Sequence, residues 1–342
     1  MLPVISAEIF CSVVLIHYYR WTGLLQDGSY QSSALVVIEN ALRRFGIVSG
    51  IPSAGYKFAR RSEPPEFLKE DDVFGYTANV GVFKHIFMRK KWPSQKWELL
   101  PLKVTINPDG SRWTGKPYTA RGPNIFIFGD SFVFGYGVND EQTFSYLLQA
   151  AKPDKNVHLF ALSGYALPQA YLRFEQIKYR IGADDVVIIG YADFYDVRNV
   201  AAPSRLRQVD WWVKNIDRSF PLQKIPRATI RPDGKLAFEL IAQNCVASDC
   251  NAVDPSQAYM TAISAKLIND IAMSTQAKVY VLHLDGSQNN PLFAMLDKRI
   301  EVISALSDDF KYFIRDDIAG FDHHPGPYWH YAISRLLIDR IR

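Results

Sequence analysis

The chain has 342 residues, of which 48% are hydrophobic and 13% aromatic, and its formal net charge is +4. This much apolar material can bury a large core, which excludes a chain that is disordered throughout. The weak positive charge is dispersed along the sequence, whereas a nucleic-acid interface needs basic residues clustered on one face. We therefore expect no nucleic acid among the partners.

The N-terminal segment, residues 1–33, begins with an apolar stretch. Residues 2–19 fall at the short end of the length that a membrane helix needs, and Glu8 and His17 weaken that interpretation. The segment lacks the basic start and the cleavage site of a secretion signal. A membrane anchor, which would associate the protein with a membrane, and a buried or amphipathic helix fit it equally well.

Residues 34–121 are predicted to form an N-terminal extension. Apolar residues at helical spacing indicate an amphipathic helix over residues 34–46. Residues 50–70 are rich in proline and charge, which predicts a linker or an extended arm. Residues 71–120 hold β-branched and aromatic residues broken by turn signals, which predicts a small β-rich segment.

From residue 122 onward, short apolar runs alternate with helical patterns. The predicted strands are residues 125–128, 157–160, 186–189, 278–284 and 311–314, and the predicted helices are residues 140–151, 168–181, 257–275, 291–305 and 326–341. This alternation is typical of a doubly wound parallel sheet, so we predict an α/β domain over residues 122–342. Residues 200–255 interrupt the alternation and are too long for an ordinary loop, so we predict an insertion there.

Two of the three cysteines, Cys245 and Cys250, lie close together in a polar part of the insertion. A local disulfide would place the protein in an oxidising compartment, and two free thiols are the alternative. With the apolar N-terminal segment, the disulfide favours an extracytoplasmic location, either periplasmic or membrane-anchored. No second pair of ligands stands nearby to complete a zinc site, and we expect neither a metal nor a cofactor.

Ser131 follows the first predicted strand of the α/β domain, in the run Gly129-Asp130-Ser131-Phe132. Ligands of open α/β sheets bind beyond the carboxyl ends of the strands, so a serine at this turn is well placed to act as a nucleophile. A helix that begins there would aim backbone N–H groups at a developing oxyanion. The alternative is purely structural, because Ser and Asp are also favoured at helix N-termini.

A serine hydroxyl needs a base, and the best candidate is His324 in the segment 321–326. The spacing Asp-x-His would allow Asp322 to orient the His324 imidazole toward Ser131. Metal binding with the help of His330 and a histidine-rich surface loop are the competing interpretations. The metal interpretation lacks a second cluster of ligands.

Together these blocks resemble the SGNH (GDSL-like) family of hydrolases. The run from Gly129 to Gly137 resembles the first block of the family, with Asp130 beside the nucleophile, and Asp322-x-His324 resembles the last. The resemblance covers residues 122–342. It implies a three-layer α/β/α sandwich with a five-stranded parallel sheet, flavodoxin-like in topology, and a serine esterase or acyltransferase with Ser131, His324 and Asp322 as its catalytic residues.

The second block of the family supplies a glycine whose N–H joins that of the nucleophile in the oxyanion hole, and Gly164 is the matching residue. The third block is usually Gly-x-Asn-Asp, but Ala192 stands here in place of the asparagine. Loss of one such donor costs about 100–1000-fold in rate. Three interpretations stay open: a hole of two backbone donors, replacement of the amide by Asn199 or Arg198, or an inactive site.

The resemblance also bears on the substrate. It implies an acetyl ester of a carbohydrate or polysaccharide, or a lipid-like ester, and an acyl-Ser131 intermediate that passes to water or to a sugar hydroxyl. Trp211, Trp212 and Phe220 of the insertion suit either stacking on sugar rings or the packing of a subdomain core. The alternative function is a non-catalytic carbohydrate-binding or polysaccharide-assembly protein on the same scaffold, marked by Ala192.

Overall fold

The computed structural model describes residues 58–90, 97–117, 122–215, 224–243, 249–285, 287, 289–305 and 324–341. Three sequence predictions lie outside these residues: the apolar segment 2–19, the helix over residues 34–46 and the strand over residues 311–314. Within the described part of the chain, no helix is both long and apolar enough to cross a lipid bilayer.

A five-stranded parallel sheet forms the centre of the fold. Its strands are β6 (Asn124–Gly129), β7 (Asn156–Ala161), β8 (Val186–Ala192), β11 (Lys278–Asp285) and β12 (Glu301–Ser304). They lie in the order β12-β11-β8-β6-β7, and every pairing is parallel. The predicted α/β fold with a doubly wound sheet is confirmed. The side chains of Ile125–Phe128 are fully buried, as expected of a central strand covered on both faces.

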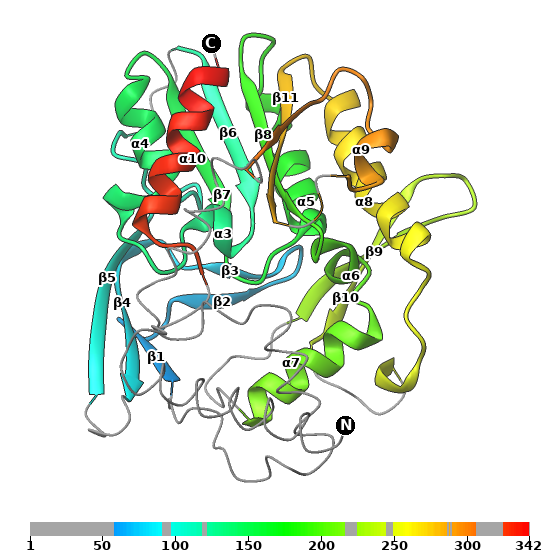
Figure 1. Ribbon diagram of the computed structural model, residues 1–342, viewed down its shortest axis with the longest axis horizontal. Helices are drawn as coiled ribbons and strands as arrows, with labels where there is room; N and C mark the ends of the chain where they lie inside the picture. Colours follow the sequence, from blue (N-terminus) through cyan, green and yellow to red (C-terminus); the bar gives the residue numbers. More distant parts are fainter. Residues whose placement is uncertain are drawn as a thin grey trace, which may run out of the picture.

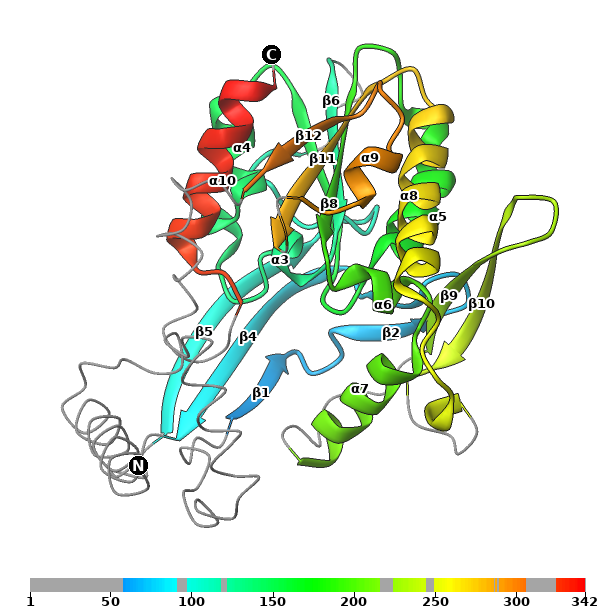
Figure 2. The same ribbon diagram turned by 45° about the vertical axis from the view of Figure 1, so that its right-hand side comes forward.

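Helices cover both faces of this sheet (Figures 1 and 2). On one face lie α4 (Phe144–Ala151) and α10 (Pro327–Arg340), and on the other lie α5 (Leu167–Ile177) and α8 (Gln257–Met273). Each pair contributes to its own buried apolar cluster. The structure is therefore the predicted three-layer sandwich.

The prediction of a helix over residues 291–305 is wrong. Helix α9 (Leu292–Met295) is only one turn long. A turn follows it, because the carboxylate of Asp297 accepts a hydrogen bond from the backbone N–H of Arg299 and its carbonyl accepts one from Ile300. The chain then enters β12, so these residues supply the fifth strand.

The extension holds more β-structure than the sequence predicts. Strands β1 (Phe58–Glu63), β4 (Gly81–Lys90) and β5 (Trp97–Ile106) form an antiparallel sheet in the order β1-β4-β5, and β2 (Leu68–Asp71) pairs with β3 (Gly75–Ala78). The predicted β-rich segment is confirmed. In the described part of residues 50–70, where a linker or an extended arm is predicted, the chain forms strands β1 and β2, with Pro64 and Pro65 between them.

The predicted insertion folds as a helix followed by a hairpin. After β8 come α6 (Tyr195–Asn199), α7 (Pro203–Asn215), the antiparallel pair β9 (Lys224–Ile230) and β10 (Leu236–Ala242), and the short turn η3 (Asp249–Asn251). Cys250 is buried and disulfide-bonded, while Cys245 lies outside the described residues. Trp211 is 57% exposed on α7, and the side chains of Trp212 and Phe220 are outside the described part.

A buried arginine joins the extension to the parallel sheet. Arg112 is 1% exposed, and its backbone bridges β5 and β7. Its Nε donates to the carboxylate of Asp140 at 2.9 Å. Its other nitrogens donate to backbone carbonyls of the loop that follows Ser131, those of Phe134, Gly135 and Val138. A residue of the extension thus holds the backbone next to the predicted nucleophile.

Replacing this arginine should be costly. We expect Arg112→Met to destabilise the protein by about 3–5 kcal/mol in urea unfolding, because the Asp140 carboxylate stays buried without its cation. The double variant Arg112→Met/Asp140→Asn removes that charge and should be more stable than the single variant. A single variant as stable as wild type would show that the pair does not hold the loop.

Candidate active site

The order of the strands in the parallel sheet indicates where a ligand would bind. Strands β6 and β8 are neighbours at the point where the order of the sheet reverses, since the chain runs from β6 outward to β7 and then returns to β8. Doubly wound sheets bind their ligands at this switch point, beyond the carboxyl ends of the strands. Ser131 follows β6 and Ala192 ends β8. Figure 1 shows α3 (Ser131–Phe134) and α6 at this end of the sheet, beside the hairpin of β2 and β3.

Ser131 is the first residue of α3. The helix is capped by Asp130, whose Oδ1 accepts a hydrogen bond of 2.9 Å from the backbone N–H of Phe132. The Asp130 N–H donates in turn to the hydroxyl of Tyr195, at 3.2 Å. The Ser131 residue is 4% exposed, and its hydroxyl donates no hydrogen bond to any residue that the structure describes.

Helix α3 packs onto the sheet without an intervening layer of side chains. The buried side chain of Val133 lies over Gly129 of β6 and Gly190 of β8. A Cβ atom added at either glycine would stand 2.3 Å from Val133 Cγ2, far inside normal contact. The two glycines therefore allow the helix to approach, and this approach fixes the height of Ser131 above the strand ends.

Gly164 needs to be glycine for two reasons. Its φ is +84°, in the left-handed region that residues with a Cβ disfavour. An added Cβ would also stand 2.5 Å from the hydroxyl of Tyr76. That hydroxyl donates to the carbonyl of Ser163 at 2.6 Å, and the Tyr165 hydroxyl donates to the carbonyl of Tyr76 at 2.6 Å. Burial raises the pKa of Tyr165 far above its ordinary value, so this donor keeps its proton.

Tyr76 belongs to β3, in the extension that the sequence resemblance does not cover. Its role is hidden in the sequence, because its contact with the Gly164 loop joins segments about 90 residues apart. No short-range pattern could have revealed this contact.

Two backbone N–H groups at this place are free to bind an anion. Neither the N–H of Ser131 nor that of Gly164 donates to another residue of the described chain. Nearly all buried N–H groups in folded proteins are paired, so the unpaired N–H of the buried Ser131 needs an explanation. An oxyanion hole requires donors of this kind, held in place and unoccupied before the reaction.

In the third block, the polar side chain of Asp193 contacts β11 and the loop that follows it. Ala192 is fully buried and offers no side-chain donor. The carboxylate of Asp193 accepts hydrogen bonds from Asn290 at 2.6 Å and from the Ser287 N–H at 2.7 Å, and lies 3.2 Å from Nε2 of His283. The block thus anchors the loop after β11.

The structure separates the two residues considered as replacements for the missing amide. The amide of Asn199 is fully buried, accepting from the Leu167 N–H at 3.0 Å and donating to Ser264 at 2.8 Å. Arg198 instead reaches Asp130, with Nη1 3.3 Å from Oδ2, and its guanidinium lies 4.3 Å from the ring centroid of Phe194. Arg198 is therefore next to the nucleophile, while Asn199 joins α6 to neighbouring helices.

His324 lies at the same corner as Ser131. Its ring centroid is 5.7 Å from that of Phe132 and 4.6 Å from that of Tyr136, residues on both sides of the α3 turn. Asp322 is outside the described residues. The described residues include no group of three potential metal ligands from His, Cys, Asp and Glu.

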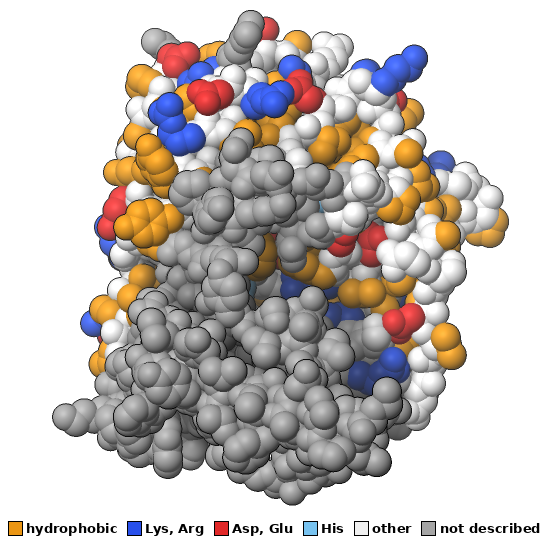
Figure 3. Space-filling model, viewed as in Figure 1, with side chains coloured by type: hydrophobic (Ala, Val, Ile, Leu, Met, Phe, Trp, Pro, Cys, Tyr) orange, Lys and Arg blue, Asp and Glu red, His pale blue; other side chains and the backbone are white. Residues whose placement is uncertain are grey.

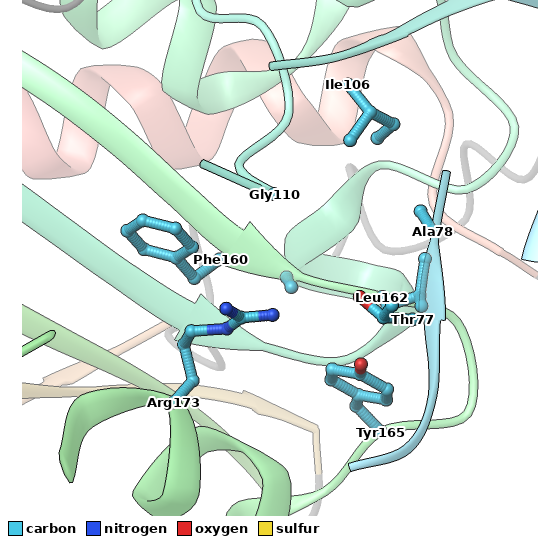
Figure 4. Close-up of a pocket in the computed structure, with 9 residues that line it drawn as sticks. Thr77, Ala78, Ile106, Gly110, Phe160, Leu162, Tyr165 and Arg173 are labelled. Atoms are coloured by element: carbon cyan, nitrogen blue, oxygen red, sulfur yellow. The ribbon is translucent and has the colours of Figure 1, made fainter. Parts of the chain in front are cut away.

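A small cavity lies beside Leu162 and Tyr165, which flank Gly164 in the chain (Figure 4). It is lined by Tyr165, Phe160 and Arg173 together with residues of β3, and measures about 10 Å³, the size of one water site. The guanidinium of Arg173 lies 4.2 Å from the ring centroid of Phe74. The cavity is too small for a substrate.

No protein-family model and no curated protein match this chain. Similar solved structures include a member of the lipolytic G-D-S-L family from Veillonella parvula (11% identity, TM-score 0.39), over 64% of this chain and 98% of that one. They also include the psychrotrophic esterase EstA from Pseudoalteromonas sp. (14%, TM-score 0.36, 64% and 96% of the chains) and TesA (12%, TM-score 0.34, 64% and 98%). These neighbours include a lipolytic G-D-S-L protein and an esterase, and the similarity is one of fold.

The packing of α3 can be tested with glycine variants. We expect Gly190→Ala to destabilise the protein by about 1–3 kcal/mol in urea unfolding, because the new methyl group overlaps Val133 Cγ2. Adding Val133→Ala removes that atom and should restore much of the loss caused by the overlap.

Gly129→Ala is the matched contrast. Its added Cβ would stand 2.5 Å from the Cβ of Val133, which alanine keeps, so Val133→Ala should not rescue this variant. Equal rescue of both glycine variants would contradict the packing described above.

Proposed function

We propose that the protein is a serine-dependent ester hydrolase or O-acyltransferase that works through an acyl-Ser131 intermediate. The observation that carries the proposal is that the N–H groups of Ser131 and Gly164, which follow the neighbouring strands β6 and β7, donate to no residue of the described chain. The position of His324 against the residues that flank Ser131 supports it.

In the first half of the reaction, Ser131 Oγ attacks the carbonyl carbon of the ester while His324 takes the hydroxyl proton. The carbonyl oxygen becomes an oxyanion and accepts hydrogen bonds from the N–H groups of Ser131 and Gly164. The bond from carbon to the alcohol oxygen then breaks. His324 returns its proton to the departing alkoxide, and the acyl group stays on Ser131.

In the second half, water or an acceptor hydroxyl takes the place of the alcohol. His324 removes its proton as it attacks the acyl carbon, and the proton then passes to Ser131 Oγ as that oxygen leaves. Asp322 would orient the imidazole and stabilise its charged form. Hydrolysis and acyl transfer use the same groups and differ only in the acceptor.

The oxyanion hole works here with two backbone donors and a nearby cation. Ala192 supplies no amide, and the Asn199 amide is engaged elsewhere. Arg198, paired with Asp130, adds positive charge beside the nucleophile and is the residue placed to compensate for the missing asparagine.

The proposed substrate is an acyl ester, in particular an acetyl ester, of a carbohydrate, and the proposed location is extracytoplasmic. The sequence blocks support the substrate class. The disulfide of Cys250 supports an oxidising compartment.

A fluorophosphonate probe tests the nucleophile. The wild-type protein should be labelled on Ser131, and Ser131→Ala should lose both the label and ester turnover while keeping its circular dichroism spectrum. Ser274→Ala, at the end of α8, is the matched control and should label as wild type does. If intact wild-type protein takes up no label, the alternative of a non-catalytic carbohydrate-binding protein is favoured, as Ala192 would then suggest.

Variants of the adjacent histidines His323 and His324 test which of them is the base. We expect His324→Ala to lower kcat for an aryl acetate by at least about 100-fold, because general-base catalysis contributes about 10²–10⁴-fold. His323→Ala, measured in the same assay, should keep most of the activity. The reverse result would assign the base to His323.

A further inference from the structure

Two arginines lie on the consecutive helices α6 and α7, and among the described residues one carboxylate, that of Asp130, forms an ion pair with them. Arg198, on α6, pairs with Asp130, the residue before Ser131. Arg205, seven residues further along, lies in the first turn of α7. Both views place α7 just beyond α6 and beneath β2, so its first turn follows closely on the helix that carries Arg198 (Figures 1 and 2).

Arg205 pairs with no carboxylate among the residues that the structure describes. Its Nη1 donates to the side-chain oxygen of Gln208 at 2.8 Å. The carboxylate at this end of α7 belongs to Asp254, which accepts instead from the backbone N–H of Ser204 at 2.8 Å. The group of Asp130, Arg198 and Arg205 therefore has an excess of one positive charge.

This arrangement costs free energy in the absence of a ligand. Burial lowers the pKa of Arg205, and the nearby charge of Arg198 lowers it further, while Tyr76 acts in the opposite direction. A cation in the first turn of a helix also opposes the helix dipole. Tyr76 is the residue whose hydroxyl lies against Gly164.

The turn that joins the two arginines is also strained. Ala201 has φ +43°, a left-handed conformation in a residue that is not glycine. Its N–H donates to the carbonyl of Arg198, and the Ala202 N–H donates to that of Val197, the pair of bonds that closes a helix in a left-handed turn. The fold thus accepts backbone strain in the turn that leads from Arg198 to α7.

The surface agrees with a binding site for an anion. Figure 3 shows basic side chains deep in a hollow on the face of the molecule drawn in Figure 1. Guanidinium groups form paired, charge-assisted hydrogen bonds with carboxylates and phosphates. An anion bound there would relieve the repulsion between the two arginines.

We propose that Arg205, with Arg198, binds an anionic group, a carboxylate or a phosphate, on the ester that Ser131 attacks. This inference rests on the proposed function for its substrate but makes a separate claim about charge. It predicts selectivity for anionic esters over neutral esters of the same shape.

The test compares three acetyl esters: 4-acetoxybenzoate, its neutral methyl ester, and 4-acetoxyphenyl phosphate. We expect Arg205→Gln to lower the ratio of kcat/KM for an anionic ester to kcat/KM for the neutral ester by about 10–100-fold, the contribution of a charge-assisted hydrogen bond. Arg205→Lys keeps the charge and should lose less. The two anionic esters show whether the site prefers carboxylate or phosphate.

Arg231→Gln is the charge-matched control, because Arg231 is exposed at the tip of the β9–β10 hairpin. It should leave the ratio unchanged. An unchanged ratio in Arg205→Gln, with turnover retained, would overturn the proposal.

A binding measurement separates this claim from the proposed function. On Ser131→Ala protein, calorimetry should detect 4-acetoxybenzoate binding more tightly than its methyl ester, and Arg205→Gln should abolish the difference. If wild-type protein turns over neither ester but this difference is present, the proposed function fails and the anion site stands. If turnover is present and the difference is absent, the anion site fails.

Discussion

The site depends on how closely α3 packs onto the ends of β6 and β8. Val133 fills the space that side chains at Gly129 and Gly190 would otherwise take. Because the helix lies directly on the strands, its first residue, Ser131, is held at the edge of the sheet with its N–H pointing out of the helix. The positions of Asp130 and its partners Arg198 and Tyr195 follow from the same contact.

The N-terminal extension contributes contacts to the candidate site in addition to those of the parallel sheet. Tyr76 donates to the carbonyl of Ser163 beside Gly164, and Arg112 donates to the carbonyls at the end of α3. Both residues lie before residue 122, where the resemblance to a known family starts. The resemblance therefore begins at residue 122, but residues on both sides of that position contribute contacts to the site.

The sequence predicted the features that depend on short-range patterns. The apolar run of β6 and the turn that follows it were sufficient to locate Ser131, and the strand–helix alternation was sufficient for the fold. The fifth strand was misplaced because the residues of β12 were assigned to a helix that ends at Met295. The choice between Arg198 and Asn199 could not be made, since both are polar neighbours on one short helix and only packing shows which faces Asp130. Tyr76 and Arg112 were missed because their partners are distant in the chain.

The order of these residues along the chain has a consequence for synthesis on the ribosome. Arg112 emerges before the loop that it binds, so the donor for those carbonyls is already present when α3 forms. His324, the proposed base, emerges only after all five strands of the sheet. The nascent protein can thus build the surroundings of Ser131, the proposed nucleophile, before the proposed base is present.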